Sequence, residues 1–205
     1  MILTKSEIKN AVQCGLIVID PFDEQMLNPN SYNYHLNHTL KVLSDRQLEP
    51  LKSPSSQEIL ILEEGIILQP GKVYLGTSVE VIGSKNYVPS LIGRSSLGRL
   101  GMFLQISADL GNLGAIHCWT LEIVVCQPIR IYPGMVVGQV SFWVPTGEKL
   151  LYSGYFGRFS EPTESSWWLL GIKEKSHDFD RTRDCAAGSQ GENLYLPFQH
   201  GAGKS

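Results

Sequence analysis

From residue 58 onward, short apolar runs alternate with residues that favour turns. Glycine and proline separate the runs, as at Gly65, Gly71, Gly83 and Pro89. Runs of this kind predict β-strands, and the glycines and prolines predict the turns between them. The predicted strands cover residues 58–62, 65–69, 72–82, 88–92, 121–133 (with a turn at Pro128) and 135–145. Many short strands with few helices predict a β-barrel or β-sandwich of mainly antiparallel strands.

The N-terminal part of the chain predicts one helix before the strands begin. Thr4 and Glu7 have the spacing of a capping box, in which two side chains cap the first turn of a helix. We expect the helix to run to about Cys14 and to stop at Gly15. Strands are then predicted over residues 16–22 and 32–42, followed by a polar surface loop over 44–58.

The pattern changes after residue 150. The segment from 151 to 168 is rich in Gly, Ser and aromatic residues and has no helix or strand period, which predicts an irregular arm. From about residue 176 the chain is charged and then small and polar, and the piece GENLYLPFQHG resembles a protease-cleavable expression tag. We therefore predict a single domain over 1–175, with its arm from about 151, and a disordered or tag-derived tail over 176–205.

Length and charge narrow the class of protein. A chain of 205 residues is long enough for one domain with its own core. Its net charge of −3 is unlike the basic surface of a nucleic-acid-binding protein, and no apolar stretch reaches the roughly 20 residues of a membrane span. The four cysteines form no C-x-x-C pair, and the five histidines have no zinc spacing. Together with the lack of a signal-peptide pattern, this predicts a cytoplasmic protein with no nucleic-acid or membrane partner and no metal ligands.

The candidate chemistry lies between residues 93 and 122. Two arginines and two serines lie between Gly93 and Arg99, and guanidinium groups offer a planar fork of donors that suits phosphate. Glu122 lies in an apolar, strand-like run, where a carboxylate must be paired or must handle protons. The two features suggest a phosphorylated substrate that undergoes acid–base chemistry. A polar turn and a solvent-facing strand residue are the simpler structural alternatives.

Four segments carry recognisable motifs: IDPFDEQMLNPNSYNYHL, LQPGKVYLGTSVEVI, GRSSLGRLGM and IRIYPGMVVGQVSFW. Through them the chain resembles the dCTP deaminase branch of the trimeric dUTPase superfamily over roughly residues 1–166. The resemblance implies a mainly β fold: a distorted jelly-roll-like β-barrel with a short N-terminal helix and an irregular C-terminal arm. It also implies a homotrimer whose active sites are shared between subunits.

The same resemblance implies an activity. The expected reaction is the hydrolytic, zinc-independent deamination of dCTP to dUTP and ammonia, which supplies dUMP and dTTP. The chain lacks the H-x-E and P-C-x-x-C signature of the zinc deaminases, in agreement with this expectation. Magnesium would enter with the nucleotide, bound through the triphosphate oxygens.

The resemblance further assigns roles to matching positions. Glu122 matches the acid that activates the attacking water, and Ser95 and Arg99 match residues that support that water. Thr120 and Leu121 lie where backbone groups of the family read the pyrimidine. The implied substrate-binding residues are Arg94, Ser95, Ser96, Leu97, Gly98, Arg99, Asn112, Thr120, Leu121, Glu122, Gln139, Tyr152 and Arg158, with Ala108 beside the base.

Several positions depart from the family pattern. Asn112 stands where the family has an Asp that contacts the deoxyribose, and Leu110 stands where it has an Arg. His117 replaces a turn glycine, and it is either a second proton carrier or, more simply, a turn or core histidine. In the arm, Tyr155 replaces a Lys that grips the triphosphate, and Arg158 either replaces that Lys or is solvated.

Two other functions stay open. The first is a dUTP pyrophosphatase or a bifunctional dCTP deaminase and dUTPase. The amide of Asn112 disfavours it, because the superfamily uses a carboxylate there for hydrolysis at the α-phosphate and an amide cannot serve as a general base. The second is a divergent member that binds a nucleotide without turning it over, which the changes at Leu110, Asn112 and Tyr155 favour.

Overall fold

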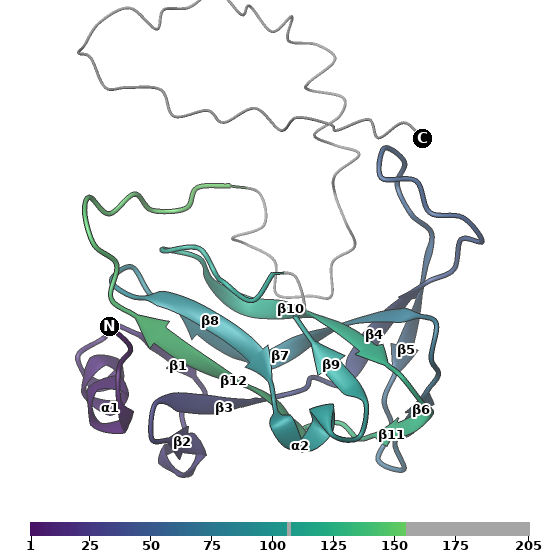
Figure 1. The fold of residues 1–205 in the computed structure, drawn as a ribbon, viewed down its shortest axis with the longest axis horizontal. Helices are drawn as coiled ribbons and strands as arrows, with labels where there is room; N and C mark the ends of the chain where they lie inside the picture. Colours follow the sequence, from purple (N-terminus) through teal and green to yellow (C-terminus); the bar gives the residue numbers. More distant parts are fainter. Residues whose placement is uncertain (106–107, 155–205) are drawn as a thin grey trace, which may run out of the picture.

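The computed structural model describes residues 1–105 and 108–154. Within them the chain forms three antiparallel β-sheets and two α-helices (Figure 1). Helix α1 spans Lys5–Gln13, helix α2 spans Ser95–Gly98, and a 3-10 turn, η1, spans Glu24–Met26. In the described ranges neither helix combines the length and the apolar composition that a bilayer crossing needs.

The largest sheet has six strands and is built around β7. Its strands are β1 (Val18–Asp20), β4 (Thr39–Leu43), β5 (Ser56–Leu60), β7 (Val73–Gly83), β9 (Met102–Leu104) and β10 (Ile116–Val125). They follow the path β5-β4-β7-β10-β9, and β1 also pairs with β7. β7 and β10 pair along most of their length, with an irregularity between Cys118 and Thr120. They cross the centre of the molecule in Figure 1, so residues of β10 have a rigid partner on one side.

The second sheet has four strands in the order β2-β3-β12-β8. Its strands are β2 (Leu27–Asn28), β3 (Ser31–His35), β8 (Val88–Gly93) and β12 (Val136–Trp143). A third, two-stranded sheet pairs β6 (Ile66–Leu68) with β11 (Ile129–Ile131). Gly138 of β12 lies opposite Tyr34 on one side and Gly93 on the other. A β-carbon on Gly138 would lie 2.1 Å from the Tyr34 hydroxyl, so the tyrosine ring occupies the space that a side chain would need.

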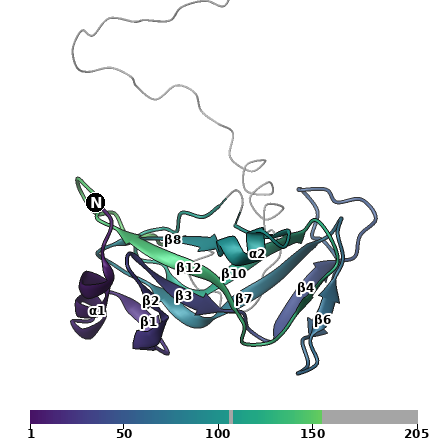
Figure 2. The same ribbon diagram turned by 60° about the horizontal axis from the view of Figure 1, so that its bottom comes forward.

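One apolar core joins the two larger sheets. Alternate residues of β4 and of the second half of β10 point into it, in keeping with the period of a β-strand. Fully buried members include Tyr32, Tyr34, Leu36, Leu40, Ile82, Leu91, Leu121, Ile123, Val140 and Phe142. α1 lies at one end of the described structure and β6 at the other (Figures 1 and 2). The core thus leaves the opposite face of β10 and β12 for other roles.

The predicted fold class is confirmed, since the protein is mainly β with antiparallel sheets and a short N-terminal helix. The helix begins after Thr4 and is followed by Gly15 with a φ of 69°, as predicted. The predicted strands over 58–62, 65–69, 72–82 and 88–92 correspond to β5, β6, β7 and β8. The strands of the described residues do not close into one barrel, because they form three separate sheets.

Three local predictions were wrong. The strand over 32–42 is two strands in different sheets, because the chain turns at Asn37, whose side chain accepts a hydrogen bond from the His38 N–H at 2.8 Å. The loop over 44–58 ends early, since β5 begins at Ser56. Thr4 is the N-cap of α1, but its hydroxyl lies 3.4 Å from that of Ser6 and makes no cap hydrogen bond. The predicted arm beyond 154 and the tail over 176–205 lie outside the described residues.

Candidate active site

The arginine and serine cluster follows β8 and includes the short helix α2. Arg94 is the N-cap of α2 and is half-buried, whereas Ser95, Ser96 and Arg99 are exposed. Leu97 points the other way and is only 8% exposed, so it anchors the turn to the core. We call residues 93–99 the arginine–serine loop. Its polar side chains are therefore presented to solvent by a loop that is fixed at both ends.

Glu122 and Thr120 lie on the face of β10 that points away from the core. Their neighbours Leu121 and Ile123 are fully buried, while Thr120 and Glu122 are half-buried. The apolar residues that flank Glu122 in the sequence thus lie on the other face of the strand, because successive side chains alternate. Leu121 contributes its side chain to the core and is paired with Gly76 of β7.

The backbone of Glu122 bonds to Gln105, which follows β9. The Glu122 N–H donates to the Gln105 side-chain oxygen at 2.8 Å, and the Glu122 carbonyl accepts from the Gln105 N–H at 3.3 Å. Alternate residues of a strand direct their backbone groups to the same side. The backbone of Thr120 therefore points to the same edge of β10, where groups of this kind can read a base.

Gln105 was missed in the sequence, where it is one polar residue after the apolar run Met102-Phe103-Leu104. No motif distinguishes it there. Its position depends on the pairing of β9 with β10, which places Leu104 opposite Ile123. The pairing joins residues far apart in the chain, so spacing alone gives no signal.

The arginine–serine loop and Glu122 are connected through β9. Leu104 pairs with Ile123 of β10, and a β-carbon placed on Gly93 would lie 3.5–3.7 Å from atoms of Leu104. The loop and the acid therefore lie on neighbouring parts of one chain. Within residues 1–105 and 108–154, the Glu122 carboxylate makes no ion pair with Arg94 or Arg99. Glu122 is therefore not held as the ion-pair partner of this loop within the described residues.

Gln139 lies on β12, next to the arginine–serine loop. It is paired with Ile92 of β8, and its neighbour Gly138 is paired with Gly93. The Gln139 side-chain oxygen accepts a hydrogen bond from the Ser31 hydroxyl at 2.7 Å, which leaves its NH₂ group as a donor. The structure therefore brings this predicted phosphate-side glutamine to the start of the loop.

Asn112 and Tyr152, both predicted substrate-binding residues, line one open cavity of about 370 Å³. The Tyr152 N–H donates to the Leu113 carbonyl at 2.7 Å and so fixes the start of the arm against the turn before β10. Glu122 and the arginine–serine loop do not line this cavity. The described part of one chain thus presents the predicted site residues as two groups. Arg158 lies outside the described residues.

His117 has the surroundings of a structural residue. It is 8% exposed, and its ring packs against Trp119 with centroids 4.5 Å apart. Its Nδ1 lies 2.8 Å from the Cys118 carbonyl and donates to it. These contacts favour the core histidine over the proton carrier. Across the described ranges, no three His, Cys, Asp or Glu side chains come together in a way that could hold a metal ion.

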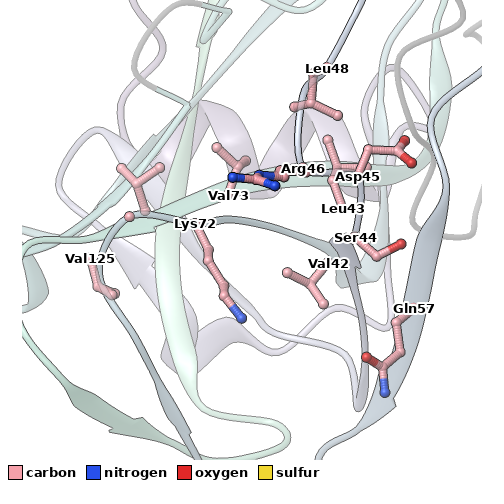
Figure 3. Close-up of a pocket in the computed structure, with 12 residues that line it drawn as sticks. Val42, Leu43, Ser44, Asp45, Arg46, Leu48, Gln57, Lys72, Val73 and Val125 are labelled. Carbon is pink, nitrogen blue, oxygen red and sulfur yellow. The ribbon is translucent and has the colours of Figure 1, made fainter. Parts of the chain in front are cut away.

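A larger cavity of about 890 Å³ lies away from these residues, between β4, β5 and the start of β7. Figure 3 shows Asp45, Arg46 and Lys72 around it, with Val42 and Val125 nearby. None of the predicted site residues lines it. Size alone therefore does not identify the functional site.

Comparison with known proteins establishes the family. A family model described as dCTP deaminase-like matches residues 2–144, which is well over half of the chain. The chain belongs to the dCTP deaminase-like family.

Several proteins similar to this chain carry names that state an activity. A protein of Cytophaga hutchinsonii named "dCTP deaminase, dUMP-forming" is 44% identical over 148 residues, covering 72% of this chain and 85% of the relative. A protein of Hathewaya histolytica with the same name is 43% identical over 163 residues, covering 80% and 93%. The crystal structure of 2'-deoxycytidine 5'-triphosphate deaminase from Agrobacterium tumefaciens matches with a TM-score of 0.56 at 20% identity, covering 70% of this chain and 48% of that one. At that identity the structural match supports the fold alone.

Proposed function

We propose that this protein is an enzyme that deaminates dCTP and releases dUMP. The names of the Cytophaga and Hathewaya relatives support it, because their identity extends over most of both chains. The resemblance predicted dUTP as the product, and the relatives' names favour the dUMP-forming alternative instead. One dCTP and two water molecules then give dUMP, ammonia and pyrophosphate.

The observation that carries the proposal is the position of Glu122. Its carboxylate lies on the outward face of β10, near the arginine–serine loop. Within the residues that the structure describes, it forms no ion pair with a Lys, Arg or His side chain. In deamination, water adds to C4 of the cytosine ring while Glu122 takes its proton and passes it to N3. Glu122 then takes the proton of the hydroxyl now on C4 and passes it to the amine, so that the C4–N bond breaks, the C4 carbonyl forms and ammonia leaves. One carboxylate is sufficient for these transfers because it is regenerated at the end.

The phosphate groups are assigned to the arginine–serine loop. Arg94 and Arg99 supply guanidinium donors, Ser95 and Ser96 supply hydroxyls, and the Gln139 NH₂ group is a further donor beside the loop. Charge-assisted hydrogen bonds of this type are the strong ones in phosphate recognition. Holding the triphosphate here orients the base toward β10.

Formation of dUMP requires a second hydrolysis, between the α- and β-phosphates. Asn112 is exposed and can donate or accept hydrogen bonds, but its amide cannot take a proton from water. The base for this step is therefore a residue other than Asn112. Asn112 and Tyr152 are left with a binding role, which their shared cavity supports.

We also propose a homotrimer with shared active sites, as the resemblance implies. The separation of the predicted residues into two groups supports it, because a second copy is needed to bring complementary groups together. Exposed apolar side chains near the arginine–serine loop, namely Ile92, Leu100 and Phe103, offer surface for such a contact. A cytoplasmic location stays a prediction from the sequence.

Zinc independence and a magnesium requirement complete the proposal. A hard cation such as magnesium prefers phosphate oxygens, so it would enter with the nucleotide and reduce charge repulsion at the arginine–serine loop. A zinc-selective chelator should leave ammonia release unchanged, whereas omission of magnesium should weaken nucleotide binding. Activity that is lost on chelation and restored by zinc alone would overturn this part.

The deciding experiment measures ammonia and pyrophosphate together. Purified protein is incubated with dCTP, dCMP or dUTP in the presence of magnesium. Equal amounts of ammonia and pyrophosphate from dCTP are expected. Ammonia without pyrophosphate would identify a dUTP-forming deaminase, and pyrophosphate from dUTP without ammonia from dCTP would identify a pyrophosphatase. Nucleotide binding with neither product would support the divergent, non-enzymatic member.

A further inference from the structure

Gln105 has an unusual backbone conformation for its residue type. Its φ is 51°, and it is the one non-glycine residue in the described ranges with a positive φ. A side chain disfavours this left-handed conformation, which persists only where surrounding contacts hold it. Gln105 is also an amide that is only 7% exposed, so its polar atoms need partners inside the protein.

Those partners are Glu122 and Ala108. The Gln105 side-chain oxygen accepts from the Glu122 N–H at 2.8 Å, and its NH₂ group donates to the Ala108 carbonyl at 3.4 Å. The Gln105 backbone N–H donates to the Glu122 carbonyl at 3.3 Å. The last regular pair between β9 and β10 is Leu104 with Ile123. Just beyond it, the side-chain amide of Gln105 replaces the backbone group that β9 no longer supplies.

These hydrogen bonds fix strand β10 at Glu122, the proposed catalytic acid. Both backbone polar groups of Glu122 bond to Gln105, so the direction of the Glu122 side chain is set from the β9 side. The same amide ties Glu122 to Ala108, the residue predicted to lie beside the base. A displacement of about 1 Å between a catalytic group and its substrate can lower the reaction rate about 10²-fold. A fixed distance between Glu122 and the cytosine ring therefore matters.

We propose that Gln105 is a positioning residue for deamination, whose amide holds Glu122 at a set distance from the substrate base. The inference rests on the proposed function and deepens it. The role requires an acceptor for the Glu122 N–H and a donor for the Ala108 carbonyl in one side chain. Glutamine supplies this acceptor and this donor in one side chain, whereas an ionised glutamate of the same length supplies only the acceptor.

The test compares Gln105→Ala and Gln105→Glu with a control, Gln127→Glu. Gln127 is an exposed glutamine whose NH₂ group donates to the Leu100 carbonyl at 3.1 Å, so the control makes the same chemical change away from Glu122. Gln105→Ala is expected to lower kcat for ammonia release about 10- to 100-fold with little change in KM. Gln105→Glu keeps the acceptor for the Glu122 N–H but loses the donor to the Ala108 carbonyl, so it should also lower kcat for ammonia release with little change in KM, whereas Gln127→Glu should not.

The outcomes separate this inference from the function beneath it. If the parent releases ammonia from dCTP and Gln105→Ala keeps kcat within about two-fold, the positioning role is wrong. An effect on KM alone, or a Gln105→Glu variant whose kcat equals that of Gln127→Glu, would overturn it equally. If Gln105→Ala does not fold, as judged by its melting temperature, the near-isosteric Gln105→Glu decides. A parent that releases no ammonia overturns the proposed function, and the positioning role for deamination with it.

Discussion

At the scale of single residues, the two faces of β10 separate packing from chemistry. Leu121 and Ile123 fill the core, while Glu122 between them points outward. Its carboxylate forms no ion pair with another residue in the described part of the chain. The arginine–serine loop shows the same division, since Leu97 is buried and Ser95 and its polar neighbours are exposed. Core side chains and the side chains proposed for the reaction therefore alternate within the same short segments.

Replacing Glu122 by Gln tests the acid directly. The amide keeps the size of the side chain but removes the basic oxygen, so ammonia release from dCTP should fall by at least about 10²–10⁴-fold. Binding of dCTP should persist, because the phosphates are held by other residues. Single-turnover rates and melting temperatures are measured on the same samples, with the exposed Glu63→Gln as a matched control. Deamination within a few-fold of the parent would exclude Glu122 as the catalyst.

Arg94→Ala should have the opposite signature. The half-buried guanidinium is expected to contribute a charge-assisted contact of about 1.5–3 kcal/mol to triphosphate binding. Its loss should weaken dCTP binding by roughly 10- to 100-fold, measured by calorimetric titration. Arg130→Ala is the control, because Arg130 is exposed on β11 and bonds to the Glu64 carbonyl instead. An unchanged Kd for Arg94→Ala would remove it from the binding site.

Part of the candidate site could be predicted from residue types and spacing. The cluster around Arg94 and the isolated acid Glu122 were recognisable as candidates in this way, and their roles in phosphate binding and proton transfer stay predictions. Gln105 was not recognisable, since its contact with Glu122 spans 17 residues and depends on a left-handed backbone. The shared cavity of Asn112 and Tyr152 was equally hidden, because it forms only when the chain after β12 returns to the turn before β10.

At the scale of elements, β12 is held between two strands by a close contact. The Tyr34 hydroxyl of β3 passes over Gly138 and donates to the Ile92 carbonyl of β8 at 3.1 Å. Gly138 pairs with Gly93 and precedes Gln139, so this contact supports the strands that carry Gln139 and lead into the arginine–serine loop. Because Gly138 of β12 has no side chain, Tyr34 of β3 can reach across it and bond to β8.

Gly138→Ala should therefore destabilise the protein. The added β-carbon would lie 2.1 Å from the Tyr34 hydroxyl and 2.6 Å from the Ile92 carbonyl oxygen, and neither strand can move freely. A cost of about 1–3 kcal/mol or more is expected in urea unfolding. Gly98→Ala is the matched control, because the nearest atom to its new β-carbon is 3.9 Å away. Equal stability of the two variants would contradict this account.

Tyr34 also gives the fold a dependence on alkaline pH. Burial, and to a lesser degree the nearby charge of Glu80, raises the pKa of Tyr34 well above its ordinary value of 10.0. The neutral phenol is favoured in the folded state, so its contribution is complete below about pH 10 and is lost as pH rises above it. Tyr34→Phe should flatten the fall in stability above about pH 10, measured by urea midpoints. Curves that stay parallel to those of the parent would show that Tyr34 is not responsible.

The strands themselves were largely predictable because each has a local apolar pattern bounded by glycine or proline. The break at residues 36–38 was not, because the alternation continues through it while the chain passes from one sheet to the other. His35 ends β3 and Thr39 begins β4, yet their polarity would suit one uninterrupted strand. Sheet membership is decided by distant partners, which a local pattern does not contain.

At the scale of the whole molecule, the two separated groups of site residues predict assembly. Sedimentation should give a particle of three times the chain mass of 22.8 kDa. Mixing Glu122→Gln with Asn112→Ala protein should then restore part of the lost ammonia release, since Glu122 and Asn112 belong to different groups and a shared site can combine one intact group from each subunit. A monomer that is fully active at nanomolar concentration, or a mixture with no more activity than its parts, would overturn the trimer.

β7 pairs with strands from both ends of the described chain. β1 ends at Asp20 and β10 ends at Val125, so the central sheet is incomplete until residues a hundred positions apart have both been made. Pairings of such high sequence separation fold slowly, on a scale of about milliseconds to seconds. During synthesis on the ribosome, β1 and β4 must wait for β10 with their apolar faces uncovered. Nascent chains that stop before β10 should therefore be open to proteases, and chains that extend past β12 should become resistant.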